Sequence, residues 1–282
     1  MANDRTILIT GVTGHQGGAI ARALQGSEFR LRGLTRKPES EPAAVLARDG
    51  IDIVQGDLDD EASLRNALSG VWGVFGVQNT WEAGVEREEV QGKRLATLAH
   101  AAGVEHYVYS SVGSAHRRTG VPHFDNKWRI EETVRGLGFP SHVVLRPVFF
   151  MENLLAPFSF NGETLTVALA PTTELQMIAV DDIGWFGARA FTHAAALNGR
   201  ALDIAGDART MPEAAATLGD ALGRPVKFTQ GSIEQIRQYS EDTALMLEWF
   251  ERVGYDADIA GLEREFGRRL TKLPDWARSH AR

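Results

Sequence analysis

The hydrophobic pattern of the first half of the chain alternates between short apolar runs and longer amphipathic ones. Each short run is rich in β-branched or aromatic residues and ends at glycine, proline, aspartate or serine, which predicts a buried strand followed by a helix. Repeated strand–helix units with nearly continuous apolar strands predict an α/β fold with a doubly wound parallel sheet. The predicted strands are 7–9, 29–35, 51–55, 71–77, 105–111 and 141–147.

Beyond residue 150 this alternation becomes irregular. We predict a short hairpin from residues 163–167 and 174–178, a helix from Val180, and further helices near 212–222, 233–239 and 243–253. The pattern therefore predicts a dinucleotide-binding domain over 1–150 and a smaller, mainly helical lobe over 151–282. No linker rich in proline, glycine and serine separates the two, so we expect them to pack together.

A glycine-rich stretch joins the first predicted strand to the first predicted helix. Gly11, Gly14 and Gly17 are spaced G-x-x-G-x-x-G, unlike the G-x-G-x-x-G of the common dinucleotide fingerprint. We expect Gly11 to turn the chain sharply, Gly14 to admit a pyrophosphate, and Gly17 to bring the helix close to the sheet. The alternative is a glycine-rich turn in another kind of α/β protein. The predicted phosphate contacts here also include Thr13, His15 and Gln16.

Composition narrows the possible functions. A net charge of −7 argues against direct nucleic-acid binding, and the absence of cysteine excludes disulfides and cysteine-ligated metals. The eight histidines form no zinc-type spacing, so we predict no metal. We expect no signal peptide, no membrane segment and a cytoplasmic location.

The cofactor preference is predicted from the end of the second strand. Arg36 lies 19 positions beyond Gly17 and Lys37 follows it, where an NAD-specific site would have an acidic residue. A guanidinium there can bind a 2′-phosphate, so we predict NADP(H) rather than NAD(H); the alternative is a solvated surface arginine. Other residues that follow predicted strands are further candidates for cofactor contacts. They are Asp57, Leu58, Gln78, Asn79, Thr80, Ser110, Pro147, Phe150 and Asn153.

The chain lacks the Tyr-x-x-x-Lys pair with which short-chain dehydrogenases transfer protons, because none of its four tyrosines precedes a lysine by four positions. His123 and Lys127 have that spacing instead and share a helical face. We predict that Lys127 binds the nicotinamide ribose, while His123 either transfers a proton or is only a polar residue at the helix start. Ser111 either orients a carbonyl or satisfies backbone groups. Residues 149–151 either form an apolar pocket wall or belong to the core.

Several stretches together resemble the NmrA-like family of atypical short-chain dehydrogenases/reductases, especially its HSCARG-like members. The resemblance implies an NADP-preferring Rossmann domain with a small C-terminal lobe, and a histidine, His123, where tyrosine is usual. Phe150 departs from family members that carry a tyrosine near the nicotinamide, which puts a tyrosine acid in doubt there. The matching stretches are 10–18, 35–38, 54–60, 81–82, 89–93, 123–127 and 152–155, with a weaker match at 180–183.

Two functions remain open from the sequence. The first is an NADPH-dependent reductase of a small apolar carbonyl, quinone or enone, with Lys127 positioning the cofactor and His123, Ser111 or water handling the proton. The second, which the resemblance implies, is a non-catalytic NADP(H) sensor that regulates a partner protein. The expected partner is thus a small-molecule substrate or a regulatory protein, and the sequence predicts no oligomeric state.

Overall fold

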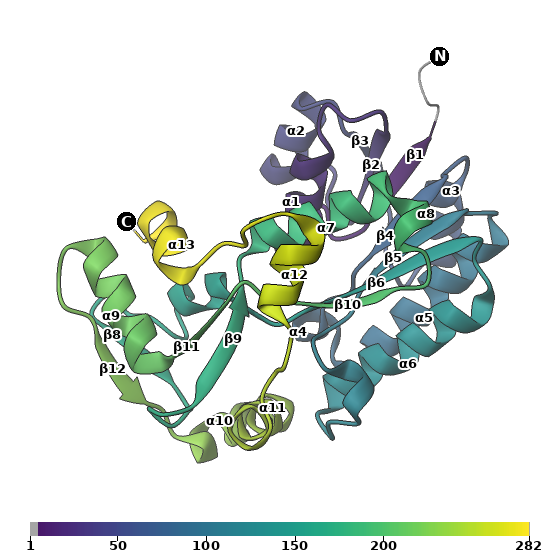
Figure 1. The fold of residues 1–282 in the computed structure, drawn as a ribbon. Coiled ribbons are helices and arrows are strands. Elements are labelled where there is room, and N and C mark those ends of the chain that lie inside the picture. Colours follow the sequence, from purple (N-terminus) through teal and green to yellow (C-terminus); the bar gives the residue numbers. More distant parts are fainter. Residues whose placement is uncertain (1–4, 282) are drawn as a thin grey trace. The chain divides into compact units, whose positions relative to one another are not determined.

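The computed structural model describes residues 5–281, and a seven-stranded sheet dominates its first half (Figure 1). The strand order is β10-β6-β5-β4-β1-β2-β3, and the neighbours among β1 to β6 pair in parallel. This confirms the predicted doubly wound α/β architecture and all six predicted strands. The strands are β1 Thr6–Ile9, β2 Arg30–Thr35, β3 Asp52–Gln55, β4 Gly73–Gly76, β5 His106–Ser110, β6 Ser141–Pro147 and β10 Ala201–Ile204.

Helices cover both faces of this sheet. On one face α3 (Glu61–Leu68), α5 (Val85–Ala101) and α6 (Pro122–Leu137) share a core with β1, β4 and β5. On the other face α7 (Val180–Thr192) packs directly on α1 (His15–Leu24), because Gly184 allows its backbone to approach Ala19. The remaining helices of this part are α2 Glu41–Arg48, α4 Thr80–Ala83 and α8 Ala194–Leu197.

The chain forms two compact units, each assembled from three segments. The first, the sheet unit, contains the chain up to Ser111 together with Asn126–Arg146 and Ile183–Leu202. The second, the small unit, contains Val112–Asp125, Pro147–Asp182 and the chain from Asp203 onward. Helix α6 is continuous across residues 125 and 126, where one unit's segment ends and the other's begins. The predicted division at residue 150 stays a prediction.

The small unit combines two small sheets with several helices. The predicted hairpin is wrong: both strands exist, but β9 (Glu174–Ile178) pairs with β11 (Asp207–Thr210) and β7 (Phe149–Phe150), whereas β8 (Thr164–Val167) pairs with β12 (Lys227–Gln230). Each strand thus finds its partner far along the sequence, which local pattern does not indicate. The helices are α9 Met211–Leu222, α10 Ile233–Tyr239, α11 Glu241–Arg252, α12 Ile259–Phe266 and α13 Leu273–His280.

One apolar core holds the small unit together. Buried side chains from β8, β9, α9, α11 and α13 pack around residues such as Trp276 and Phe250. Helix α9 begins with a capping box between Thr210 and Glu213, which satisfies its first backbone N–H groups. Within residues 5–281, no helix is both long and apolar enough to cross a membrane.

Candidate functional site

The glycine loop between β1 and α1 has the geometry that the sequence predicts. Gly11 adopts φ +59°, and its carbonyl accepts a hydrogen bond from the Gly14 N–H at 2.9 Å. A Cβ on Gly17 would lie 2.3 Å from the Gly11 carbonyl oxygen, so only glycine lets α1 start this close to the loop. Thr13, Gly14 and His15 are exposed around the start of α1, where backbone N–H groups favour an anion.

Arg36 and Lys37 lie exposed just beyond β2, on the same edge of the sheet. The Arg36 guanidinium forms an ion pair with Glu82 of α4, and both side chains remain more than half exposed. Asn79 at the end of β4 donates a hydrogen bond to the other oxygen of Glu82 at 3.3 Å. The arrangement keeps Arg36 beside the carboxyl edge of the sheet without burying its charge.

Beyond β3, Asp57 and Leu58 form a turn. The Asp57 carboxylate accepts from the Asp59 N–H at 3.0 Å, and the Leu58 carbonyl accepts from Arg94 at 2.8 Å. The side chain of Asp57 thus stabilises the turn, and its predicted contact on the adenine side stays a prediction.

The ends of β4 and β5, which are neighbours in the sheet, carry buried polar groups without partners. Both amide atoms of Gln78 and the hydroxyl of Ser111 lack a hydrogen-bond partner among residues 5–281. Ser110 differs, because its hydroxyl donates to the Gln16 carbonyl oxygen of α1 at 2.6 Å. Buried polar groups are nearly always satisfied, so Gln78 and Ser111 indicate that a polar ligand or water belongs here.

Lys127 is held by a carboxylate that the sequence analysis did not select. The Lys127 ammonium lies 2.8 Å from Glu88 Oε1, and the Glu88 side chain is completely buried. The other Glu88 oxygen accepts a hydrogen bond from the Thr80 hydroxyl. One signal could have found Glu88: it shares the buried stripe of α5 with Gln91, Gly92 and Leu95, where a charge needs a partner.

His123 has an equally specific partner inside the small unit. Its Nδ1 lies 2.6 Å from one oxygen of Asp242, and its backbone N–H donates to the other oxygen at 2.9 Å. Both side chains are largely buried, at 7% and 13% exposed. Nδ1 and the backbone N–H of His123 thus both face the Asp242 carboxylate, which orients the imidazole ring. Asp242 lies 119 residues away, and no sequence spacing could have indicated it.

An aromatic cluster surrounds this histidine. The Phe124 ring meets the imidazole edge-on at 4.7 Å, and Trp249, Phe250 and Tyr255 pack around Phe124. In the same unit, Pro147 ends β6 with its carbonyl bonded to Gly113, while Phe150 and Asn153 are half-buried. Their predicted cofactor contacts stay predictions.

Two tyrosines of β5 are removed from proton transfer. Tyr107 and Tyr109 are fully buried, and their hydroxyls have no partner within the described part of the chain. Burial raises the pKa of the Tyr107 phenol, and burial together with the nearby Glu88 charge raises the pKa of Tyr109. Neither phenol is suited to supply a proton at neutral pH.

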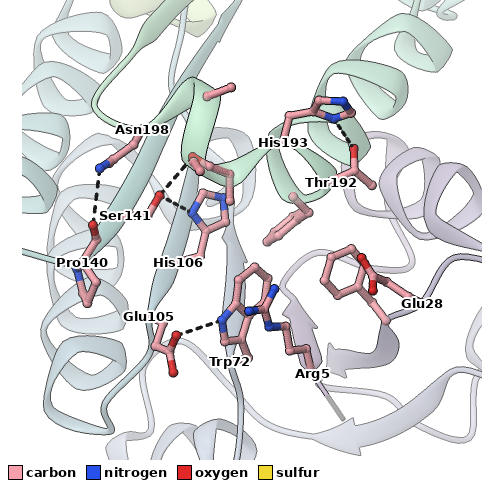
Figure 2. Close-up of a pocket in the computed structure, with 15 residues that line it drawn as sticks. Arg5, Glu28, Trp72, Glu105, His106, Pro140, Ser141, Thr192, His193 and Asn198 are labelled. Atoms are coloured by element: carbon pink, nitrogen blue, oxygen red, sulfur yellow. Dashed lines mark hydrogen bonds between the residues drawn. The ribbon is translucent and has the colours of Figure 1, made fainter. Parts of the chain in front are cut away.

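A cleft of about 620 Å³ opens at the opposite, amino edge of the sheet (Figure 2). Trp72, just before β4, lines it beside His106, and its indole N–H donates to Glu105 at 3.2 Å. Burial lowers the pKa of His106 to about 4, so this imidazole is neutral at physiological pH. The cleft contains no predicted cofactor residue, and the groups just described at the carboxyl edge are separate from it.

Acidic and histidine side chains do not form a metal site here: no group of three or more that could hold an ion occurs between residues 5 and 281.

Of two similar proteins, one matches about half of this chain and the other matches nearly all of it. An NmrA-like domain oxidoreductase of Aspergillus japonicus is 36% identical over 160 residues, which is 54% of this chain and 48% of that protein. The match therefore spans about half of that relative's length. A (4-alkanoyl-5-oxo-2,5-dihydrofuran-3-yl)methyl phosphate reductase of Streptomyces griseus is 30% identical and covers 98% of both chains.

Solved structures share the fold. The negative transcriptional regulator NmrA in complex with NADP has a TM-score of 0.81 at 20% identity, covering 98% of this chain and 95% of that one. An NADPH-dependent quinone oxidoreductase of Escherichia coli, complexed with NADPH, has a TM-score of 0.80 at 25% identity, covering 97% and 99%. The model of the NmrA-like family matches residues 3–279, and the chain therefore belongs to the NmrA-like family.

Proposed function

We propose that the protein is an NADPH-dependent reductase of a small apolar carbonyl, quinone or enone. The observation that carries the proposal is the buried contact between His123 and Asp242. A carboxylate that orients a buried imidazole favours an enzyme over a protein that only binds a dinucleotide. That pairing is the arrangement by which enzymes hold a histidine ready to exchange a proton.

The residues at the carboxyl edge of the sheet suit NADP(H). Gly17 lets the start of α1 lie close to the Gly11 backbone, so that the N–H groups of α1 can face a phosphate, and Arg36 supplies a guanidinium for the 2′-phosphate. The buried amide of Gln78 lacks a partner that a polar ligand could supply. Lys127 would bind the nicotinamide ribose. The solved relatives named above contain NADP or NADPH, which supports the same assignment.

When bound, the reduced cofactor supplies a hydride, and the chain must then deliver a proton. His123 precedes Lys127 by four positions on α6. Asp242, 2.6 Å from Nδ1, would orient the imidazole for this transfer. Ser111 remains a candidate for orienting the substrate oxygen, because its buried hydroxyl lacks a partner in the described structure.

The compounds reduced by two relatives support the proposed substrate class. Quinones are planar and apolar, and a 4-alkanoyl-5-oxo-2,5-dihydrofuran carries a double bond conjugated with two carbonyl groups. The conjugated double bond of the furanone can accept a hydride at carbon and a proton at the neighbouring carbon, and a quinone takes up a hydride and a proton to give a hydroquinone with both hydrogens on oxygen.

The test follows NADPH absorbance with a panel of quinones and enones, using wild type, His123→Asn and Lys127→Ala. We expect oxidation by wild type, a loss of turnover in His123→Asn with NADPH binding retained, and weakened NADPH binding in Lys127→Ala. His193→Gln, at the amino edge of the sheet, is the matched control and should behave as wild type. Turnover that is unchanged in His123→Asn would refute the proposed role of the imidazole.

The second candidate function is a non-catalytic NADP(H) sensor that regulates a partner protein. The observation that favours it is the burial of Tyr107 and Tyr109, which leaves the sheet without a tyrosine acid. Tight NADP(H) binding without oxidation by any compound of the panel would favour this sensor.

A further inference from the structure

The Lys127 ammonium and the Glu88 carboxylate form an almost completely buried ion pair at the carboxyl edge of the sheet. Glu88 is 0% exposed and Lys127 only 11% exposed, at a separation of 2.8 Å. Buried charges are tolerated when they are paired and hydrogen-bonded, and the Thr80 hydroxyl completes the coordination of the carboxylate. Lys127 would therefore contact the nicotinamide ribose as one member of an ion pair with no net charge.

One further contact, and the positions of Thr80 and Glu88 in their helices, hold this pair in place. Asn126, the residue before Lys127, donates its side-chain amide to the Val85 carbonyl at the start of α5. Thr80 begins α4, directly before that helix. Glu88 occupies the first turn of α5, where the helix dipole favours a negative charge. The position of Glu88 and its contact with Lys127 thus both fix the carboxylate in place.

The two redox forms of a nicotinamide differ by one positive charge on the ring. A lone ammonium beside the ribose would disfavour the oxidised, positively charged form relative to the reduced, neutral form. A lone carboxylate would have the opposite effect. A neutral pair largely cancels both.

We propose that Glu88 is a positioning residue that balances the charge of Lys127 and thereby sets the relative affinity of the protein for NADP⁺ and NADPH. The inference rests on the proposed binding of NADP(H) by the sheet unit. It assigns to Glu88 a role in cofactor discrimination as well as in holding the lysine. The ratio of the two affinities decides which form occupies the protein when both are present.

The experiment is titration calorimetry of NADP⁺ and NADPH with four proteins: wild type, Glu88→Gln, Lys127→Met and the double variant. We expect the ratio Kd(NADP⁺)/Kd(NADPH) to rise about fivefold in Glu88→Gln, which leaves the ammonium unbalanced. In Lys127→Met it should fall by about the same factor. The double variant should return to within about twofold of the wild-type ratio, although both ligands bind more weakly.

The matched control is Glu89→Gln, one position along the same helix. Glu89 pairs with Lys93 at 2.6 Å and Arg129 at 2.8 Å on the outer face of α5, so its loss should leave the ratio unchanged. Circular dichroism establishes that each variant is folded. If one single variant does not fold, the other single variant carries the test together with the double variant, in which neither buried charge is left unpaired.

The outcomes distinguish a failure of the proposed function from a failure of the proposed role of Glu88. Wild type that binds no dinucleotide refutes the proposed function itself. Wild type that binds both forms, with the same ratio in the two single variants, refutes only the role of Glu88. A double variant whose ratio differs from wild type by more than about twofold also overturns it.

Discussion

Replacing Gly17 by alanine is the sharpest single test of the glycine loop. A Cβ at this position would lie 2.3 Å from the Gly11 carbonyl oxygen, 2.6 Å from its carbon and 2.7 Å from the Thr10 carbonyl oxygen. All three are backbone atoms, which cannot rotate away as a side chain would. Ordinary contact needs at least about 3.4 Å, so α1 and the loop must separate by roughly 1 Å.

The cost follows from that displacement. Overpacking of this kind destabilises proteins by about 1–3 kcal/mol, and we expect Gly17→Ala near the upper end because the clash involves only backbone. The neighbouring Gly18→Ala is the matched control. Its Cβ would lie 3.2 Å from the Val12 carbonyl oxygen, and alanine is favoured over glycine inside a helix by about 1 kcal/mol. The two effects in Gly18→Ala should nearly cancel.

The assay combines urea unfolding with calorimetric titration of NADPH. We expect Gly17→Ala to lose about 2–3 kcal/mol of stability and at least about tenfold in NADPH affinity, because the α1 N–H groups move away from the phosphates. Gly18→Ala should change stability by less than about 1 kcal/mol. If Gly17→Ala is as stable as Gly18→Ala and binds NADPH as well as wild type, the close approach of α1 to the loop has no role in binding.

Three other predictions concern separate parts of the molecule. Arg36→Ala should weaken NADPH binding by about tenfold and leave NADH binding unchanged, and equal losses for both by calorimetry would contradict the 2′-phosphate contact. Asp242→Asn keeps an acceptor for the His123 backbone N–H but removes the carboxylate beside Nδ1, so turnover should fall at least about a hundredfold in the NADPH absorbance assay, with the exposed Glu241→Gln as control. The pKa of His106 is lowered from 6.5 to about 4 by burial, so the unfolded chain gains a proton first and stability should fall by about 3 kcal/mol as pH drops from about 6.5 to 4. In His106→Gln, urea unfolding over the same pH range should not show this loss. If His106→Gln loses as much stability over that range as wild type does, His106 is not the cause of the loss.

The sequence by itself determined the architecture of the sheet unit. Strands β1, β4 and β6 are largely buried on both faces, so they appear as nearly continuous apolar runs, and the helices between the strands are long enough to be recognised by their periodicity. The glycine loop could also be predicted, because close backbone approach and positive φ leave a direct trace in residue type at Gly11 and Gly17. The spacing of His123 and Lys127 is likewise local, since one helical turn separates them.

Only the tertiary structure decided which strands pair with one another and which side chains lie against Lys127 and His123. Strands β8 and β9 were predicted in the correct places, but their neighbours come from segments around 207–230, and a two-residue periodicity carries no information about distant pairing. Glu88 and Asp242 were not selected at all. Each is an ordinary acidic residue until the fold buries it against a cation or an imidazole, and burial and long-range proximity do not exist before the chain has folded.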